Sequence, residues 1–444
     1  MADICEKEMS RVPILVILGA TGSGKTKLSI QLAQKFSGEI ISADSMQVYK
    51  GLDIITAKVT REERLQAPHH MIDIVDPLVN YTVVEFRNRA LSVIDNLMSR
   101  KKLPIIVGGT NYYIEALLWQ ILIDDPEESS DNDQQTKKPR LNTSETNEEL
   151  HKKLAQVDPK MAQCLHPNNR RKVIRSLEIY EKFGRQHSEL LRLQRTGGGC
   201  GIGGPLRYKD LIILWLRCDQ EVLDSRLDER VESMVEAGLI QELLDFHERY
   251  NEDRLKNNAA PDYTRGIFQS IGFKEFHNYL ILPEDERNSQ KGQQMLQESI
   301  AELKLVTRRY ARRQRKWIMN RMIRRTDRQV PSIYSLNCTN MEKWTNDVLN
   351  PAIEIVTSLI RGEQPKQKSM NENIEEQKST DILNDMPHFC EICERLFVGE
   401  LQWNMHLKSI KHKKVTEKKK RSIKQQEKIN TEQSTQQGIE QRST

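Results

Sequence analysis

Apolar and polar positions alternate in blocks along the first part of the chain. The apolar run at 12–18 ends at Gly19, which is typical of a buried parallel strand that leads into a turn. Apolar side chains then recur at helical spacing, and strands and helices continue to alternate. This order predicts a doubly wound α/β domain whose ligands bind at the carboxyl ends of the strands. The predicted elements are strands at 12–18, 39–45 and 103–110 and helices at 28–36 and 83–102.

This alternation stops near Trp119. Residues 124–149 contain almost no apolar side chains and predict a disordered insertion. Residues 150–193 are helical in pattern and basic, and the glycine-rich stretch 196–205 predicts a flexible loop. The region 120–205 is therefore predicted to be a helical insertion within the α/β domain.

Strand and helix patterns return after the insertion. The apolar run 211–219 predicts a strand, and Asp219 is the expected N-cap of a helix at 220–237. A long helix is predicted at 296–325, with one apolar stripe and one positive stripe, because residues 300–330 hold eleven basic and two acidic side chains. The predicted boundaries are an α/β domain at 1–119 and 206–362 around the insertion at 120–205, a polar linker at 363–386, a compact segment at 387–416 and a basic disordered tail at 417–444.

The composition argues against several classes of protein. Lys and Arg number 68 and Asp and Glu 63, so the formal net charge of +5 selects no partner by itself. No apolar run reaches the ~18 residues that a membrane span needs, and the acidic first residues predict neither a secretory signal nor a clear transit peptide. Seven mostly isolated cysteines indicate a reduced, intracellular protein. We expect a cytoplasmic monomer without a membrane partner, and nuclear and mitochondrial pools stay open.

The strongest chemical signal is GATGSGKT at 19–26, which matches the G-x-x-x-x-G-K-[ST] pattern between a predicted strand and a predicted helix. Backbone amides of such a loop and of the helix N-terminus cradle diphosphate oxygens. Lys25 adds a positive charge, and the Thr26 hydroxyl can hold Mg²⁺. The loop therefore predicts a diphosphate site without specifying ATP. The expected contacts are Thr21, Gly22, Ser23, Gly24, Lys25 and Thr26.

Two polar positions follow other predicted strands at the same edge of the sheet. Asp44 ends the second strand, and its carboxylate could coordinate Mg²⁺, accept a proton from an incoming nucleophile, or cap the next turn. Thr110 follows Gly108 and Gly109, which permit a ligand to approach the backbone closely. A simple tight turn explains the two glycines equally well.

Basic residues gather in two regions, Arg170–Arg175 in the insertion and Arg308–Lys316 on the long helix. Each region alone is as readily a solvated face, but two of them beside a phosphate-binding fold favour a polyanion as partner. Arg226 and Arg230, spaced i,i+4, could close over a diphosphate or form ion pairs on the surface. Lys274 is a further candidate for the diphosphate.

The C-terminal region carries Cys390, Cys393, His406 and His412 with two, twelve and five residues between them. Two thiolates and two imidazoles at this spacing predict a closed tetrahedral Zn²⁺ site, a C2H2 finger that needs the metal to fold. Phe397 and Leu407 could supply its small core. The basic sequence that follows favours contact with RNA shape and backbone, with protein binding as the alternative.

These motifs together resemble the tRNA dimethylallyltransferases, or tRNA isopentenyltransferases, in the eukaryotic form that ends in a zinc finger. The resemblance covers roughly residues 12–325 and 388–413. It implies a P-loop NTPase-like doubly wound parallel sheet with a helical insertion domain and a C-terminal C2H2 zinc finger. The segments that carry it are GATGSGKT (19–26), ISADSMQVYKGLDIITAK (41–58), HHMIDIVDP (69–77), IIVGGTNYYI (105–114), HPNNRRKVIRSLEIY (166–180), RLDERVESMVEAGLIQEL (226–243), GIFQSIGFKEF (266–276) and TRRYARRQRKW (307–317).

The resemblance implies transfer of a dimethylallyl group from dimethylallyl diphosphate to N6 of adenosine 37, in the anticodon stem-loop of tRNA. The P-loop then holds the diphosphate of the prenyl donor rather than ATP, Mg²⁺ assists, and Zn²⁺ is structural. Asp44 matches the general base of the family, and Thr21 would touch the donor. The residues that match tRNA-contacting segments are Asp44, Ser45, Met46, Gln47, Thr110, Arg171, Lys172, Val173, Ile174, Arg175, Gln269, Ser270, Ile271, Arg308, Arg312 and Arg313.

Two other functions compete with this one. An ATP-dependent small-molecule or nucleoside kinase would use the same P-loop, but it needs neither the basic regions nor the finger. A non-catalytic RNA-binding protein would need no intact Lys25 and Thr26 together with Asp44.

Overall fold

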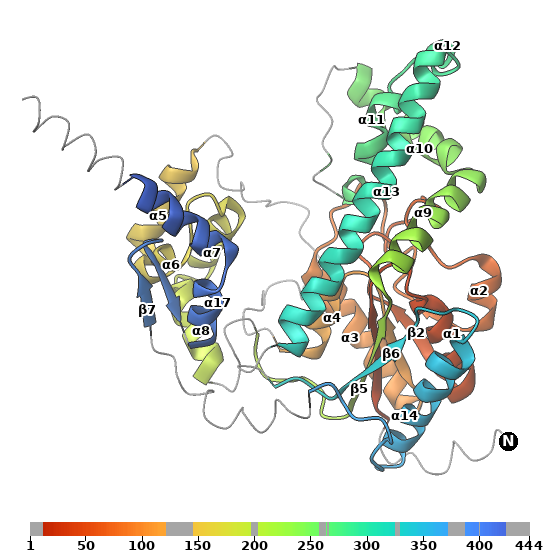
Figure 1. Ribbon diagram of the computed structural model, residues 1–444, viewed down its shortest axis with the longest axis horizontal. Helices are drawn as coiled ribbons and strands as arrows, with labels where there is room; N and C mark the ends of the chain where they lie inside the picture. Colours follow the sequence, from red (N-terminus) through yellow and green to blue (C-terminus); the bar gives the residue numbers. More distant parts are fainter. Residues whose placement is uncertain are drawn as a thin grey trace, which may run out of the picture. The chain divides into compact units, whose positions relative to one another are not determined.

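The computed structural model describes residues 12–120, 145–196, 203–256, 263, 266–324, 329–371, 387–398 and 400–422. The chain divides into two compact units (Figure 1). The sheet unit comprises 1–121, 205–325 and 329–375, and the helical unit comprises 122–204, 326–328 and 376–444. The insertion predicted at 120–205 therefore coincides closely with the first segment of the helical unit.

A six-stranded sheet forms the centre of the sheet unit, and all of its neighbouring strands pair in parallel. The strand order β3-β2-β4-β1-β5-β6 places β1 in the interior, with Leu15 opposite Ile105 of β4 and Ile212 of β5. This arrangement confirms the doubly wound α/β fold. The strands are β1 (Ile14–Gly19), β2 (Glu39–Ser42), β3 (His69–His70), β4 (Pro104–Val107), β5 (Leu211–Arg217) and β6 (Ile333–Asn337).

Both faces of this sheet are covered, as the continuous apolar sequence of β1 requires. Leu15 and Ile17 pack into one cluster with side chains of α1 (Lys25–Phe36) and α14 (Asn350–Ile360). Val16 and Leu18 pack into the other cluster with α3 (Val83–Ser99) and α4 (Asn111–Leu118). Alternate residues of a strand point to opposite faces, so one short apolar run anchors both layers.

Helices between β5 and β6 rise beyond the strand ends (Figure 1). The longest, α13, begins at 290 rather than 296, because the Ser289 hydroxyl accepts a hydrogen bond from the Gly292 amide and caps it. Asp219 occupies the N-cap position of α9, but its side chain makes no capping bond. The helices are α9 (Gln220–Glu236), α10 (Leu239–Lys256), α11 (Phe273–Leu280), α12 (Glu284–Arg287) and α13 (Gln290–Ile318), followed by a π-helical turn (Met319–Ile323); α2 (Arg61–Gln66) and two short turns (Gly266–Gln269, Thr345–Leu349) complete the unit.

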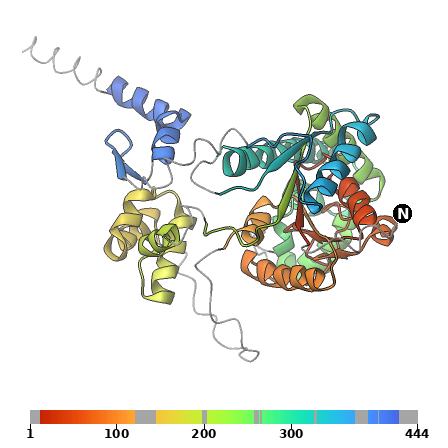
Figure 2. The ribbon, with the colours of Figure 1, turned by 90° about the horizontal axis from the view of Figure 1, so that it is seen from below.

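The helical unit has its own core, in which Leu150, Leu154, Met161 and Val173 are buried. Figure 2 shows its helices together with the C-terminal segment. That segment belongs to the same compact unit, and the Arg395 guanidinium donates to the Cys164 carbonyl at 3.1 Å. Its elements are α5 (Asn147–Val157), α6 (Pro159–Cys164), α7 (Arg170–Phe183), α8 (His187–Thr196), β7 (Pro387–Cys390), β8 (Arg395–Val398) and α17 (Glu400–Leu407).

Several predicted boundaries differ from the structure. Residues 410–422 are helical, so the disordered tail predicted from 417 is wrong for 417–422. Residues 145–149 belong to the α5 region rather than to a disordered stretch, since Thr146 and Glu149 form a capping box. The first residues of the predicted linker, 363–371, belong to the sheet unit, where Asn371 is buried and donates to the Val330 and Pro331 carbonyls. The predicted stretches 124–144, 197–202, 372–386 and 423–444 lie outside the described residues. Within the described part of the chain, no helix has both the length and the apolar character to cross a bilayer.

The close approach of β2 and β4 gives a stability prediction. A Cβ atom at Gly108 would lie 2.1 Å from the Ala43 carbonyl oxygen, which is backbone and cannot rotate away. We expect Gly108→Ala to lower the free energy of unfolding by about 3 kcal/mol, because the two strand ends must separate. Urea unfolding of the purified protein measures this loss.

Gly362→Ala is the matched control in the same unit. Its φ is also positive, at +73°, but nothing lies within 4 Å of the added Cβ. Only the left-handed backbone opposes that substitution, at a cost of about 1 kcal/mol. Equal losses in the two variants would contradict the predicted clash.

Candidate functional site

The glycine-rich turn connects β1 to α1 at the carboxyl edge of the sheet. Gly22 and Gly24 have φ values of 79° and 86°, in the left-handed region that favours glycine. Gly24 is the N-cap of α1, no side chain caps the helix, and its first turn holds no acidic residue. The first amides of α1 are therefore left for a ligand, and the partial positive charge of the helix N-terminus favours an anion.

Two partly buried cations lie at this turn. The Lys25 ammonium donates to the Ala20 carbonyl at 2.8 Å, and the Arg230 guanidinium donates to the Thr21 hydroxyl at 3.3 Å. Burial, and then the nearby Arg230, lowers the pKa of Lys25 from 10.5 to about 8, and burial likewise lowers the pKa of Arg230. Asp44 opposes these shifts in both groups. The site thus has an excess of desolvated positive charge, which an anionic ligand would offset.

A cavity of about 750 Å³ joins the turn to the ends of β2 and β4. Its walls come from the strand ends, from α9 and from α13, all within the sheet unit. The lining residues include Thr21, Gly22, Gly24, Lys25, Thr26, Asp44, Ser45, Met46, Gln47, Gln269, Ser270, Ile271 and Arg313. Ser23 is buried and donates to the Ala20 carbonyl, so it shapes the turn. Most residues predicted separately from the P-loop and from the family resemblance line one space.

Asp44 lies directly after β2 and uses its two oxygens differently. Oδ1 accepts a hydrogen bond from the Met46 amide at 3.0 Å, which is the capping role that the sequence left open. Among the described residues, no group donates to Oδ2. A Cβ atom at Gly109 would lie 2.7 Å from Oδ2, so a side chain at this position would displace the carboxylate. Asp44 therefore caps the turn and still presents an oxygen for chemistry.

Thr110 connects the loop after β4 to the loop after β2. Its hydroxyl accepts from the Ser45 amide at 2.9 Å and donates to the Ser45 hydroxyl at 3.1 Å. Gln47 anchors the same loop, since its amide donates to the carbonyls of Thr56 and Ala57. In this structure Thr110, Ser45 and Gln47 hold the segment that carries Asp44.

Ser270 contributes a polar atom to the cavity without a partner. Its hydroxyl is buried, and no described residue forms a hydrogen bond with it. Buried polar atoms in native proteins are almost always satisfied. Because Gln269 and Ile271 line the same cavity, this wall is suited to a ligand with hydrogen-bonding groups.

The basic residues of α13 do not all face a ligand. Arg308 forms an ion pair with Asp228 of α9, and Arg312 forms one with Asp224, so both help to pack α13 against α9. Arg313 lines the cavity, with its guanidinium 5.8 Å from the centre of the Tyr310 ring.

The three basic residues considered as diphosphate ligands, Arg226, Arg230 and Lys274, occupy different environments. The Arg226 guanidinium donates to the carbonyls of Cys338 and Thr339 and holds the segment after β6. Lys274 is exposed and does not line the cavity. Only Arg230 reaches the glycine-rich turn, and none of the three forms a described ion pair on the surface.

Gln314 and Tyr310 of α13 belong to the site but were missing from the sequence prediction. The Gln314 side chain accepts from the Thr21 amide and donates to the Gly109 carbonyl, each at 2.8 Å. The Tyr310 hydroxyl donates to the same carbonyl at 3.1 Å. The sequence feature that could have identified them is their i,i+4 spacing. It places the neutral amide of Gln314 on the same apolar stripe as Tyr310, which is the side of the helix that packs.

The predicted RNA-contacting stretch of the helical unit lies on α7. Arg171, Lys172 and Arg175 are exposed there, and Arg175 lies 3.7 Å from Glu178. Val173 is fully buried and Ile174 packs against the same core, so these two side chains support the helix instead.

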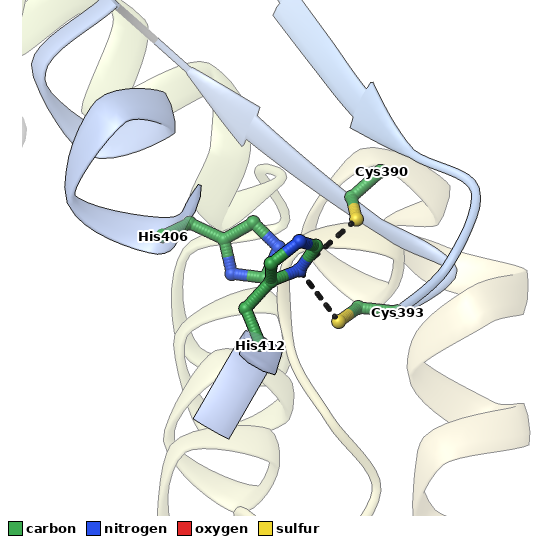
Figure 3. A group of neighbouring side chains, drawn as sticks. All are labelled: Cys390, Cys393, His406 and His412. Atoms are coloured by element: carbon green, nitrogen blue, oxygen red, sulfur yellow. Dashed lines mark hydrogen bonds between the residues drawn. The ribbon is translucent and has the colours of Figure 1, made fainter. Parts of the chain in front are cut away.

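The four Cys and His side chains of the C-terminal segment point toward one another (Figure 3). Their candidate ligand atoms all lie within 4.8 Å of one another. His412 Nδ1 is 3.7 Å from the Cys390 sulfur and 3.4 Å from the Cys393 sulfur. A tetrahedral zinc site with ordinary bond lengths separates N and S ligands by about 3.6 Å. His406 Nε2 is buried without a protein partner, so the residues fit a structural Zn²⁺.

The small core of this finger differs from the predicted one. Phe397 stacks on His406 at 4.0 Å between ring centres, as a core residue should. Leu407 is 38% exposed, and Trp403 takes its place, with His388 stacked on one side and Phe397 tilted against it. The error arose because the sequence pattern does not fix which side of a short helix faces the metal.

Comparison with known proteins agrees with these features. Residues 47–321 match the family model of IPP transferase, and residues 387–413 match that of the zinc-finger double-stranded RNA-binding domain. The tRNA dimethylallyltransferase of Homo sapiens is 48% identical over 92% of this chain and 87% of its own length. The enzyme of that name from Saccharomyces cerevisiae is 34% identical over 90% and 91%.

A solved structure extends the comparison to the fold. The chain resembles a eukaryotic dimethylallyltransferase that is known from crystallographic snapshots of the enzyme acting on tRNA. The TM-score is 0.68 at 32% identity, and the match covers 94% of this chain and 99% of the other. This chain therefore belongs to the tRNA dimethylallyltransferase family of IPP transferases.

Proposed function

We propose that this protein transfers the dimethylallyl group of dimethylallyl diphosphate to N6 of adenosine 37 in the anticodon stem-loop of tRNA and releases diphosphate. The observation that carries the proposal is the single cavity that contains both Lys25 and Asp44. A cationic, amide-rich end suits a departing anion, and a carboxylate suits removal of a proton. Prenyl transfer to an amine needs both in one space.

The glycine-rich turn is proposed to bind the diphosphate of the donor. The first amides of α1, Lys25 and Arg230 supply donors and charge, and the Thr21 hydroxyl accepts a hydrogen bond from Arg230. These groups stabilise negative charge that increases as the bond to carbon breaks, so they favour the transition state over the bound substrate.

Asp44 is proposed to act as general base toward the acceptor. The N6 nitrogen forms a bond to C1 of the prenyl group while the C1–O bond breaks and its electron pair leaves with the diphosphate. The proton lost from N6 passes to Asp44 Oδ2, the oxygen that no described residue engages. Because an exocyclic amine of adenine is a weak nucleophile, its alignment should matter as much as its deprotonation.

Magnesium fits the same end of the cavity. Thr26 lines the cavity beside Lys25, and Mg²⁺ in phosphate sites takes only one or two protein oxygens with substrate phosphates and water as its other ligands. Such an ion would neutralise charge on the diphosphate. We propose that the Thr26 hydroxyl would bind this Mg²⁺ ion.

The tRNA is proposed to use several surfaces of the chain. Adenosine 37 must leave the stack of the anticodon loop to reach Asp44, and the unpartnered Ser270 hydroxyl is a candidate hydrogen-bond partner for the extruded nucleotide. Arg171, Lys172 and Arg175 expose positive charge on α7 for the phosphate backbone. The zinc finger would add backbone contacts.

The first prediction from this function concerns the reaction itself. Purified protein with undermodified tRNA, Mg²⁺ and dimethylallyl diphosphate should yield an adenosine heavier by one prenyl unit, which mass spectrometry of the digested tRNA detects and maps to position 37. The same mixture with ATP in place of the prenyl donor should give no modified nucleoside. Consumption of ATP without any need for a prenyl donor would instead support the kinase.

The second prediction concerns Asp44. We expect Asp44→Asn to lower kcat by about 100- to 10,000-fold, because the amide cannot accept the proton. The side-chain oxygen of Asn can still accept from the Met46 amide, so the turn after β2 should remain intact. The affinity for tRNA, measured by filter binding, should stay within about threefold of the wild type. An active Asp44→Asn enzyme would refute the role of general base.

The third prediction concerns pH. The pKa of Lys25 in the free protein is about 8, below its ordinary value of 10.5, so Lys25 loses its charge as the pH rises above 8. The affinity for a non-reactive analogue of the prenyl diphosphate should therefore decline above pH 8, by up to tenfold per pH unit. Calorimetric titration without tRNA measures this affinity.

Lys25→Arg is the control for the pH effect. A guanidinium at this position keeps its charge, so its affinity for the analogue should show no inflection near pH 8. An identical decline in both proteins would assign the effect to another group.

A further inference from the structure

Gln314 of α13 joins two loops that belong to different strands. Its side chain is buried, and both of its polar atoms are occupied by backbone groups. The carbonyl oxygen accepts from the Thr21 amide in the loop after β1, and the amide nitrogen donates to the Gly109 carbonyl in the loop after β4. One side chain thus bridges the two loops beyond the last paired residues of β1 and β4.

The loop after β4 in turn fixes Asp44. Gly109 packs so closely that any side chain there would meet Asp44 Oδ2, and Thr110 holds the Ser45 amide. A continuous set of contacts therefore runs from Thr21 through Gln314 and Gly109 to Asp44. Its first member lies at the proposed diphosphate site, and its last is the proposed base.

We propose that Gln314 is a positioning residue that sets the separation between the diphosphate site and Asp44. This inference rests on the proposed prenyl transfer, in which the nucleophile, the prenyl carbon and the leaving oxygen must align. A displacement of about 1 Å in such an arrangement can reduce the rate 100-fold. Since its polar atoms are engaged by the backbone, Gln314 acts through the two loops.

Neighbouring contacts distinguish this role from ordinary packing. Tyr310 donates to the same Gly109 carbonyl but makes no described hydrogen bond to the loop after β1, so it supports only one of the two loops. Ser289 stabilises the distant start of α13 through its cap. A variant at Tyr310 therefore tests the loss of support for one loop, and a variant at Ser289 tests a loss of helix stability. Only variants at Gln314 break the link between the two loops.

The test compares four variants with the wild type in single-turnover prenyl transfer. Gln314→Met keeps the length and removes both hydrogen bonds, and we expect the rate of the chemical step to fall about 10- to 100-fold. Gln314→Asn keeps the amide but is one methylene too short to reach both loops, and we expect a loss in the same direction. Tyr310→Phe should lose less than either, and Ser289→Ala should keep the wild-type rate.

The distribution of the effect between kcat and KM identifies positioning. The KM values for tRNA and for the prenyl donor should stay within about threefold in both Gln314 variants, because the groups that bind the substrates are intact. Thermal unfolding of all variants accompanies the assays. A Gln314→Ala protein serves as a further variant if Gln314→Met does not fold.

Three outcomes would overturn the inference. The first is a wild-type rate in folded Gln314→Asn and Gln314→Met. The second is a rise in KM at constant kcat, which would make Gln314 a binding residue. The third is a loss in Ser289→Ala equal to that in Gln314→Met, which would assign the effect to the stability of α13. Absence of transfer by the wild-type protein is a different result, since it refutes the proposed function and, with it, this role of Gln314.

Discussion

Parallel pairing of β1, β2 and β4 is the constraint on which the site depends. It brings three loops to one edge of the sheet, and each loop supplies a different chemical group: the glycine-rich turn after β1, Asp44 after β2, and Gly109 with Thr110 after β4. The loops approach so closely that a side chain at Gly108 would meet the Ala43 backbone, and one at Gly109 would meet the Asp44 carboxylate. The strand order thus brings the groups of the site together, and the two glycines allow the loops after β2 and β4 to lie close to each other.

The charge at this edge is costly for the protein alone. Burial lowers the pKa of Lys25 and of Arg230, which means that both cations give up part of their hydration on folding. Asp44 is the nearby carboxylate that opposes both shifts, and one negative charge does not balance two positive ones. An unbalanced, desolvated positive charge of this kind is typical of sites that bind an anionic ligand, because the bound anion neutralises the excess charge.

The sequence predicted the parts of this arrangement that depend on local pattern. The strand at β1, the glycine-rich turn and the Cys/His spacing each follow from residues close together in the chain. Gln314 was missed because its partners, Thr21 and Gly109, are distant in sequence and are backbone groups, which no side-chain motif records. The partners of Arg308 and Arg312, Asp228 and Asp224 of α9, are likewise distant in sequence, so these ion pairs were not predicted either.

The connection to the helical unit consists of two chain segments that are hydrogen-bonded to each other. The segment that leads into the insertion and the segment that returns from it lie side by side. The Gln120 amide donates to the Pro205 carbonyl, and the Arg207 amide donates to the Leu118 carbonyl. Leu118 ends α4, which begins directly after Thr110. The insertion therefore enters and leaves the fold without interrupting any strand pair, and its own buried core makes it a separate body. Under the proposed function, the acceptor tRNA would bind this body while the sheet edge keeps its close packing around Asp44 and Lys25.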